Sequence, residues 1–106
     1  MKNALRVVLV VLTFSLIFSS LSFAQGGADL FKAKCAMCHG PDGKGQTTIG
    51  KNLNLRDLGS ADVQGQSDAD LTKIIADGKG KMKGFADRLS KDQIGDVVKY
   101  IRTLKH

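Results

Sequence analysis

The sequence is poor in the residues that build rigid or cross-linked folds. It contains no tryptophan, one proline, one tyrosine and two cysteines among its 106 residues. Two cysteines exclude a disulfide-rich scaffold, which usually needs four or more. No segment shows the alternation of apolar and polar residues that indicates a strand, so a βαβ arrangement is not expected. The basic residues are not interleaved with aromatic ones, which argues against a nucleic-acid partner.

Residues 1–24 have the pattern of a targeting segment. Two positive charges stand at the start, an apolar run covers residues 7–18, and residues 22–24 end it with a small-x-small signal. This pattern is typical of a secretory signal peptide, here cleaved after Ala24. The apolar run is short for a membrane span of about 20 residues, although an uncleaved anchor is the alternative. We expect residues 25–106 to form one exported domain, in the periplasm or, alternatively, in a thylakoid lumen.

Aromatic side chains are scarce in this domain of 82 residues, which carries only Phe31, Phe85 and Tyr100. A domain of this size usually needs a disulfide, a metal or a cofactor to be stable, because its core is small. Its net charge falls from +6 to +4 once the two basic residues of the targeting segment are removed. The sparse core therefore predicts a large apolar cofactor.

Three helices are predicted from the spacing of apolar residues, which makes the expected fold class all-α. The first covers residues 28–36, and the second begins at Ser67 and stops at Gly78. The third is the clearest, because Ser90 and Gln93 form a capping box before apolar residues at positions i, i+3, i+4 and i+7. The connections between the helices are long and glycine-rich, which makes sense if they wrap a cofactor. These connections are residues 40–65 and 78–84.

Residues 35–39 read Cys-Ala-Met-Cys-His, the C-x-x-C-H pattern of covalent haem attachment. Two intervening residues allow both thiols to reach the vinyl groups of one haem from a short helix and to form thioethers. The adjacent histidine then points a ring nitrogen at the iron as the proximal ligand. We therefore predict one haem c bound by Cys35, Cys38 and His39.

Three other interpretations of this motif are weaker. A disulfide between Cys35 and Cys38 would close a tiny loop and stabilise little. A thioredoxin-like redox pair needs a βαβ context. A zinc site needs four ligands, and would have to add His106 to the three residues of the motif. The export signal and the sparse core both favour haem.

Met82 is the predicted distal ligand of the iron. The other methionine of the exported domain, Met37, lies inside the attachment motif and cannot reach the opposite haem face. A Met/His pair is a common haem ligation, and the glycines near Met82 allow the backbone to approach a flat cofactor. The alternatives are a neighbouring lysine, His106 or a purely structural role for Met82. His106 itself is expected to be frayed and solvated, because it is terminal.

With both ligands placed, the chain resembles the small class I monohaem cytochromes c of bacteria over residues 27–104. Gly27 and Phe31 match a glycine and an aromatic of that family's N-terminal helix, and Tyr100 matches the aromatic that packs on them. The resemblance implies the cytochrome c fold, in which three main helices and long loops surround one covalent haem. Two further segments match, Cys38–Gly45 and Leu71–Gly78.

The resemblance also implies His39 and Met82 as the two iron ligands, with two departures from the family pattern. Lys83 stands where the family often has a proline, and no proline follows Pro41 to supply the carbonyl that orients the histidine. Another carbonyl, within Ile49–Leu55, is expected to take that part, because such hydrogen bonds fix ligand orientation. The expected haem pocket includes four apolar side chains, those of Leu53, Leu55, Phe85 and Leu89.

A six-coordinate iron leaves no position open to a substrate, so the predicted function is electron transfer and not catalysis. The carrier is expected to be a monomer that serves an oxidase, a reductase, a dehydrogenase or a photosynthetic complex, and to meet a membrane only through such partners. Lys79, Lys81 and Lys83 would steer it toward acidic docking surfaces, unless they are simply a solvated face. If Met82 does not bind iron, the alternative is a five-coordinate haem protein that binds a gas or peroxide. Without haem, the chain would be a thiol–disulfide module.

Overall fold

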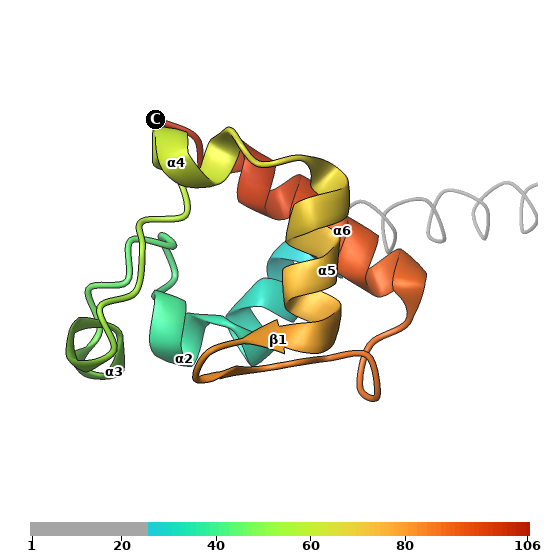
Figure 1. The fold of residues 1–106 in the computed structure, drawn as a ribbon, viewed down its shortest axis with the longest axis horizontal. Helices are drawn as coiled ribbons and strands as arrows, with labels where there is room; N and C mark the ends of the chain where they lie inside the picture. Colours follow the sequence, from blue (N-terminus) through green and yellow to red (C-terminus); the bar gives the residue numbers. More distant parts are fainter. Residues whose placement is uncertain (1–25) are drawn as a thin grey trace, which may run out of the picture.

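The computed structural model describes residues 26–106, so the targeting segment predicted at residues 1–24 lies outside the described residues. A helix over residues 26–34 leads into a series of short elements that follow a ring-like path (Figure 1). No helix among the described residues combines the length and apolar character that a membrane span requires. The further elements are α2 (Ala36–His39), α3 (Thr48–Asn52), α4 (Ala61–Gln64), α5 (Asp68–Asp77), β1 (Gly78–Lys79), β2 (Met82–Lys83) and α6 (Lys91–Thr103).

The three predicted helices are present; the first covers residues 26–34 and ends before its predicted end at residue 36, whereas the ends of the other two follow the expected signals. Ser67 caps α5 by accepting a hydrogen bond from the Asp70 amide at 3.0 Å, and Gly78 ends this helix with a φ of +82°. Ser90 and Gln93 form the predicted capping box of α6. The mostly helical architecture confirms the all-α fold class.

The connection predicted at residues 40–65 is not wholly irregular, because it contains α3 and α4. Helices of four or five residues are too short to show a helical period in the sequence. The loop after α5 likewise contains a small hairpin, in which β1 and β2 pair antiparallel with Lys79 opposite Met82. Two-residue strands leave no detectable alternation, so sequence patterning could not reveal this hairpin.

The N-terminal helix crosses α6 at a close contact that the family resemblance predicts. The Phe31 side chain is fully buried, and its ring centroid lies 5.1 Å from that of Tyr100 with the planes tilted by 49°. A Cβ atom built on Gly27 would overlap the backbone carbonyl of Asp96 in α6. Only glycine therefore permits the two backbones to approach this closely. The predicted packing of Gly27, Phe31 and Tyr100 is confirmed.

Candidate functional site

The attachment motif sits on a break between two helical segments. Cys35 forms a turn, and its amide donates to the Phe31 carbonyl at 2.8 Å, which ties the motif to the N-terminal helix. Cys38 and His39 lie in α2 (Figure 1), and the His39 amide donates to the Cys35 carbonyl at 3.0 Å. Both thiols are free and half-buried. The local fold thus places two thiols and an imidazole within one turn, as covalent haem attachment requires.

The chemical state of these side chains suits haem better than thiol redox chemistry. Burial, with a smaller contribution from Cys38, raises the pKa of the Cys35 thiol to about 11. Redox-active cysteines instead have lowered pKa values, because the thiolate is the nucleophile. No group of three His, Cys, Asp or Glu side chains among residues 26–106 is arranged to hold a metal ion. The raised pKa of Cys35 thus argues against the thiol–disulfide module.

The His39 ring is half-buried and incompletely paired. Burial lowers the pKa of His39, which favours the uncharged imidazole that a metal needs. Its Nδ1 atom is buried and finds no hydrogen-bond partner among the described residues. The expectation that a carbonyl within Ile49–Leu55 orients this ring is therefore not met. Buried polar atoms without a partner are rare, and a metal bound by the other ring nitrogen would still leave Nδ1 in need of one.

Thr47 holds the C-terminal end of the attachment motif by a hydrogen bond, a role that was not predicted from the sequence. Its hydroxyl donates to the Cys38 carbonyl at 2.6 Å and accepts from the Gly50 amide at 2.8 Å. The second bond makes Thr47 the N-cap of α3. A Cβ atom on Gly50 would lie 2.7 Å from the Cys38 carbonyl oxygen, so a glycine is needed where α3 meets the motif. The preference of threonine for helix N-caps was the available signal.

Met82 and its basic neighbours point in different directions. Met82 is half-buried and packs against the hydrophobic core, whereas Lys79, Lys81 and Lys83 are exposed. The loop after Met82 is joined to α5 because the Phe85 amide donates to the Ile75 carbonyl at 2.8 Å. The other methionine of the described residues, Met37, is 78% exposed. Of the two thioethers, that of Met82 is the one turned inward.

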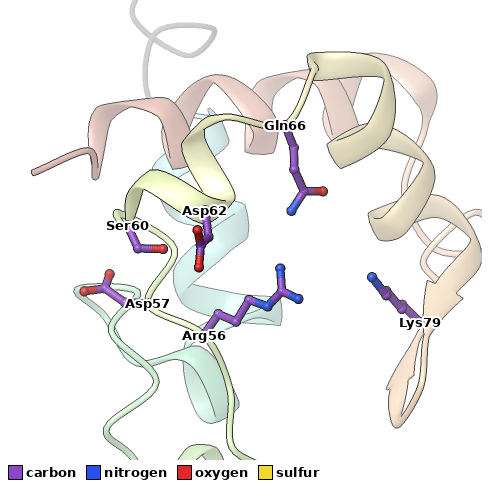
Figure 2. Close-up of a pocket in the computed structure, with 6 residues that line it drawn as sticks. All are labelled: Arg56, Asp57, Ser60, Asp62, Gln66 and Lys79. Carbon is purple, nitrogen blue, oxygen red and sulfur yellow. The ribbon is translucent and has the colours of Figure 1, made fainter.

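A cavity of about 660 Å³ lies between the chain around α4 and the β1 strand (Figure 2). This volume is within the range of roughly 300–1,000 Å³ that is typical of ligand and cofactor sites. Figure 2 shows Arg56 reaching into the space from one side and Lys79 from the other. Neither cation forms an ion pair with any described residue. The lining residues are Arg56, Asp57, Ser60, Asp62, Gln66 and Lys79.

The four apolar residues expected in the haem pocket do not line this cavity. Leu89 belongs to the hydrophobic core, and Phe85 packs against that core with the Arg88 guanidinium 5.7 Å from its ring centroid. Leu53 and Leu55 are half-buried. The polar lining was not predicted, because its residues lie in irregular chain or in elements of two to four residues, which are too short for a periodicity to indicate which side chains turn inward.

His106 is exposed, as expected, but it is hydrogen-bonded and not frayed, so that part of the expectation is wrong. Its Nε2 atom lies 2.7 Å from Oδ2 of Asp57, and its amide donates to the Gly59 carbonyl at 3.2 Å. Asp57 Oδ1 also accepts from the Gly59 amide at 2.9 Å. The terminal residue is thus held against a segment that lines the cavity.

Comparisons with known proteins agree with this geometry. A family model described as Cytochrome C oxidase, cbb3-type, subunit III matches residues 23–101. Cytochrome c6 of Gloeothece citriformis is 34% identical over 104 residues, which cover 94% of this chain and 91% of that protein. The cbb3-type cytochrome c oxidase subunit FixP of Azorhizobium caulinodans is 37% identical over 82 residues, but these cover only 27% of its length. The solved structure of the KustC0563 c-type cytochrome superposes with a TM-score of 0.70 at 29% identity, covering 76% of this chain and 98% of that one.

The donor set and the comparisons point to the same cofactor. Two half-buried thiols and an imidazole within one helical turn are the donor set that covalent haem attachment needs. The matched family region includes all three residues of the attachment motif. The chain therefore belongs to the cytochrome c family, as a small monohaem class I electron-transfer protein with one covalently attached haem c.

Proposed function

We propose that this protein is a periplasmic carrier that passes single electrons between redox proteins through a haem ligated by His39 and Met82, and that it is not an enzyme. The observation that carries the proposal is the inward position of Met82, because no other described methionine is turned into the fold. Haem supplies the one-electron chemistry of its iron when bound. A carrier of this kind needs both axial positions filled by the protein, which leaves none for a substrate.

The chain's own residues have separate parts in this function. Cys35 and Cys38 hold the haem through thioethers, and His39 offers a neutral ring nitrogen. The apolar surroundings of Met82 keep water from the thioether, and such surroundings raise the potential of a His/Met haem.

Visible spectroscopy of the protein matured in a periplasm tests the ligation. The wild-type protein should be low-spin, with a methionine-to-iron charge-transfer band. Met82→Ala should remove that band, give high-spin ferric iron and allow carbon monoxide to bind after reduction. Met37→Ala is the matched control and should change none of these signals, because Met37 is 78% exposed.

The same spectra decide between the alternatives. A wild-type protein that is already high-spin and binds carbon monoxide readily would favour the five-coordinate gas- or peroxide-binding protein. A colourless protein with reactive thiols would exclude both haem functions.

We also propose that Lys79, Lys81 and Lys83 steer the carrier toward acidic surfaces of an oxidase, reductase, dehydrogenase or photosynthetic complex. All three are exposed beside the half-buried Met82. Exchanging them for Glu should slow reduction of the carrier by its partner at low salt by 10-fold or more, the lower end of the on-rate gain from electrostatic steering, roughly 10 to 1,000-fold. The same exchange at the exposed Lys91 and Lys99 on α6 is the control. Equal rates and equal salt dependence in both variants would refute the steering.

A further inference from the structure

The two peptide groups on either side of His39 have all four of their polar atoms hydrogen-bonded. The two amides make helical contacts: that of His39 donates to the Cys35 carbonyl at 3.0 Å, and that of Gly40 donates to the Ala36 carbonyl at 2.8 Å. The two carbonyls belong to the last residues of α2, where a helix has no further amides to offer as donors. Their partners therefore come from outside the helix.

Both partners lie in the segment that follows α2 in the sequence. The Gly45 amide donates to the His39 carbonyl at 2.7 Å. The Thr47 hydroxyl donates to the Cys38 carbonyl at 2.6 Å. The main chain is closely packed here, because a Cβ atom on Gly50 would overlap the carbonyls of Gly45 and Cys38. Of the four bonds around His39, only that of Thr47 comes from a side chain, so it is the one that a substitution can remove.

The imidazole of His39 has no comparable support of its own. Its Nδ1 atom is buried and finds no hydrogen-bond partner among the described residues. At metal sites a bond from that second ring nitrogen usually fixes the orientation of the ligating ring. The direction in which the His39 side chain leaves the main chain is instead set by the two restrained peptide groups, because their planes determine φ and ψ of this residue.

We propose that Thr47 is a positioning residue for the axial histidine, which orients the His39 ring through the main chain in place of a bond to the ring itself. The inference rests on the proposed function, in which His39 is an iron ligand. The Thr47 hydroxyl restrains the peptide group that joins Cys38 to His39, and so couples the second thioether position to the ligand. Because this hydroxyl accepts from the Gly50 amide at 2.8 Å, its single proton is left for the Cys38 carbonyl.

Proton NMR of the ferric holoprotein tests this role, because the shifts of the haem methyl protons in low-spin ferric haem depend on the orientation of the axial ligands. Thr47→Val keeps the branched shape of the side chain but removes the hydroxyl. This variant should shift and broaden the methyl resonances, because the His39 ring samples other orientations. Thr47→Ser keeps a hydroxyl that can both donate and cap, and should retain the wild-type resonances.

Two further variants separate the bond to Cys38 from the cap of α3. Thr47→Asp can still accept from the Gly50 amide, but an ionised carboxylate cannot donate to the Cys38 carbonyl. It should therefore shift the resonances as Thr47→Val does. Ser67→Ala removes an N-cap of the same kind from α5, where the hydroxyl accepts from the Asp70 amide at 3.0 Å. It should unfold at lower temperature without shifting the resonances.

A Thr47→Asp variant with the wild-type resonances would show that Thr47 merely caps α3, and would overturn the proposal. If that variant yields no holoprotein, wild-type resonances in Thr47→Val would overturn it equally. Wild-type resonances that are already broadened by exchange between ring orientations would do so without any variant, and an equal shift in Ser67→Ala would show a general loss of stability instead of positioning. Failure of the proposed function is seen separately, as a wild-type visible spectrum without the low-spin signature of His/Met ligation.

Discussion

The helix crossing and the chain after the attachment motif are stabilised in different ways. The N-terminal helix, α5 and α6 contribute most of the buried apolar side chains, including Phe31 and Val97, and no polar side chain is fully buried among the described residues. Residues 40–59, here called the glycine segment, bury no large side chain. Every buried residue in the glycine segment is a glycine, namely Gly40, Gly43, Gly45, Gly50 and Gly59.

This contrast shows which part of the fold depends on the cofactor. Buried glycines bring backbone segments together but remove little apolar surface from water, so they contribute little hydrophobic stabilisation. The glycine segment is instead held by individual hydrogen bonds, such as Thr47 to the Cys38 carbonyl and His106 to the Gly59 carbonyl. We infer that the helix crossing carries its own core, whereas the glycine segment needs haem to supply one.

Removing haem should have the largest effect and should fall on the glycine segment. The Cys35→Ala, Cys38→Ala double variant removes both thioether attachments. We expect it to lose more than about 4 kcal/mol of stability, the contribution of a ligand present at 1,000 times its dissociation constant. Amide hydrogen exchange should show residues 40–59 unprotected while α6 keeps part of its protection. A haem-free chain with equal protection in both regions would contradict the contrast.

Two glycine substitutions test whether the helix crossing is tightly packed. Gly27→Ala places a Cβ atom against the Asp96 carbonyl in the helix crossing, and should cost about 1–3 kcal/mol as overpacking does elsewhere. Gly95→Ala, within α6, meets no atom within 4 Å, and should add about 0.5–1 kcal/mol by its higher helix propensity. Urea unfolding of the holoprotein measures both. If Gly27→Ala were as stable as wild type or more stable, the crossing would not be a tight contact.

The difference between local signals and contacts with distant parts of the chain explains what could be predicted from the sequence. Ser90, Gln93 and the apolar spacing of α6 are local signals, so the helix and its buried face followed directly from them. The attachment motif could also be recognised from the sequence, because covalent haem attachment uses five consecutive residues, Cys35–His39. Arg102 gave no such signal, since its guanidinium donates hydrogen bonds to the Gln64 and Gln66 carbonyls, which lie more than 30 residues away in the sequence. His106 was misjudged for that reason, because its partner Asp57 lies 49 residues away.

The smallest predicted effect concerns Asp57, which lies where the C-terminus meets the glycine segment. The Gly59 amide and then the His106 side chain lower the pKa of the Asp57 carboxyl below its ordinary value of 3.8. An acid with a lowered folded-state pKa stabilises the fold above its unfolded value and loses that contribution as the pH falls through the folded value. Asp57→Asn should therefore be less stable than wild type at about pH 5, and this difference should shrink below pH 3.8.

A matched variant separates this local pairing from a general change of charge. Asp87→Asn removes an exposed carboxylate that makes no hydrogen bond or ion pair among the described residues, and its stability relative to wild type should not follow that pH profile. His106→Gln should show a weaker version of the Asp57→Asn profile, because the Gly59 amide is the larger cause of the lowered pKa. Thermal unfolding between pH 3 and 7 measures all three. If His106→Gln had the larger effect, the C-terminal residue and not the turn at Gly59 would be the main support of this carboxylate, and the glycine segment would depend on α6 more than its own hydrogen bonds indicate.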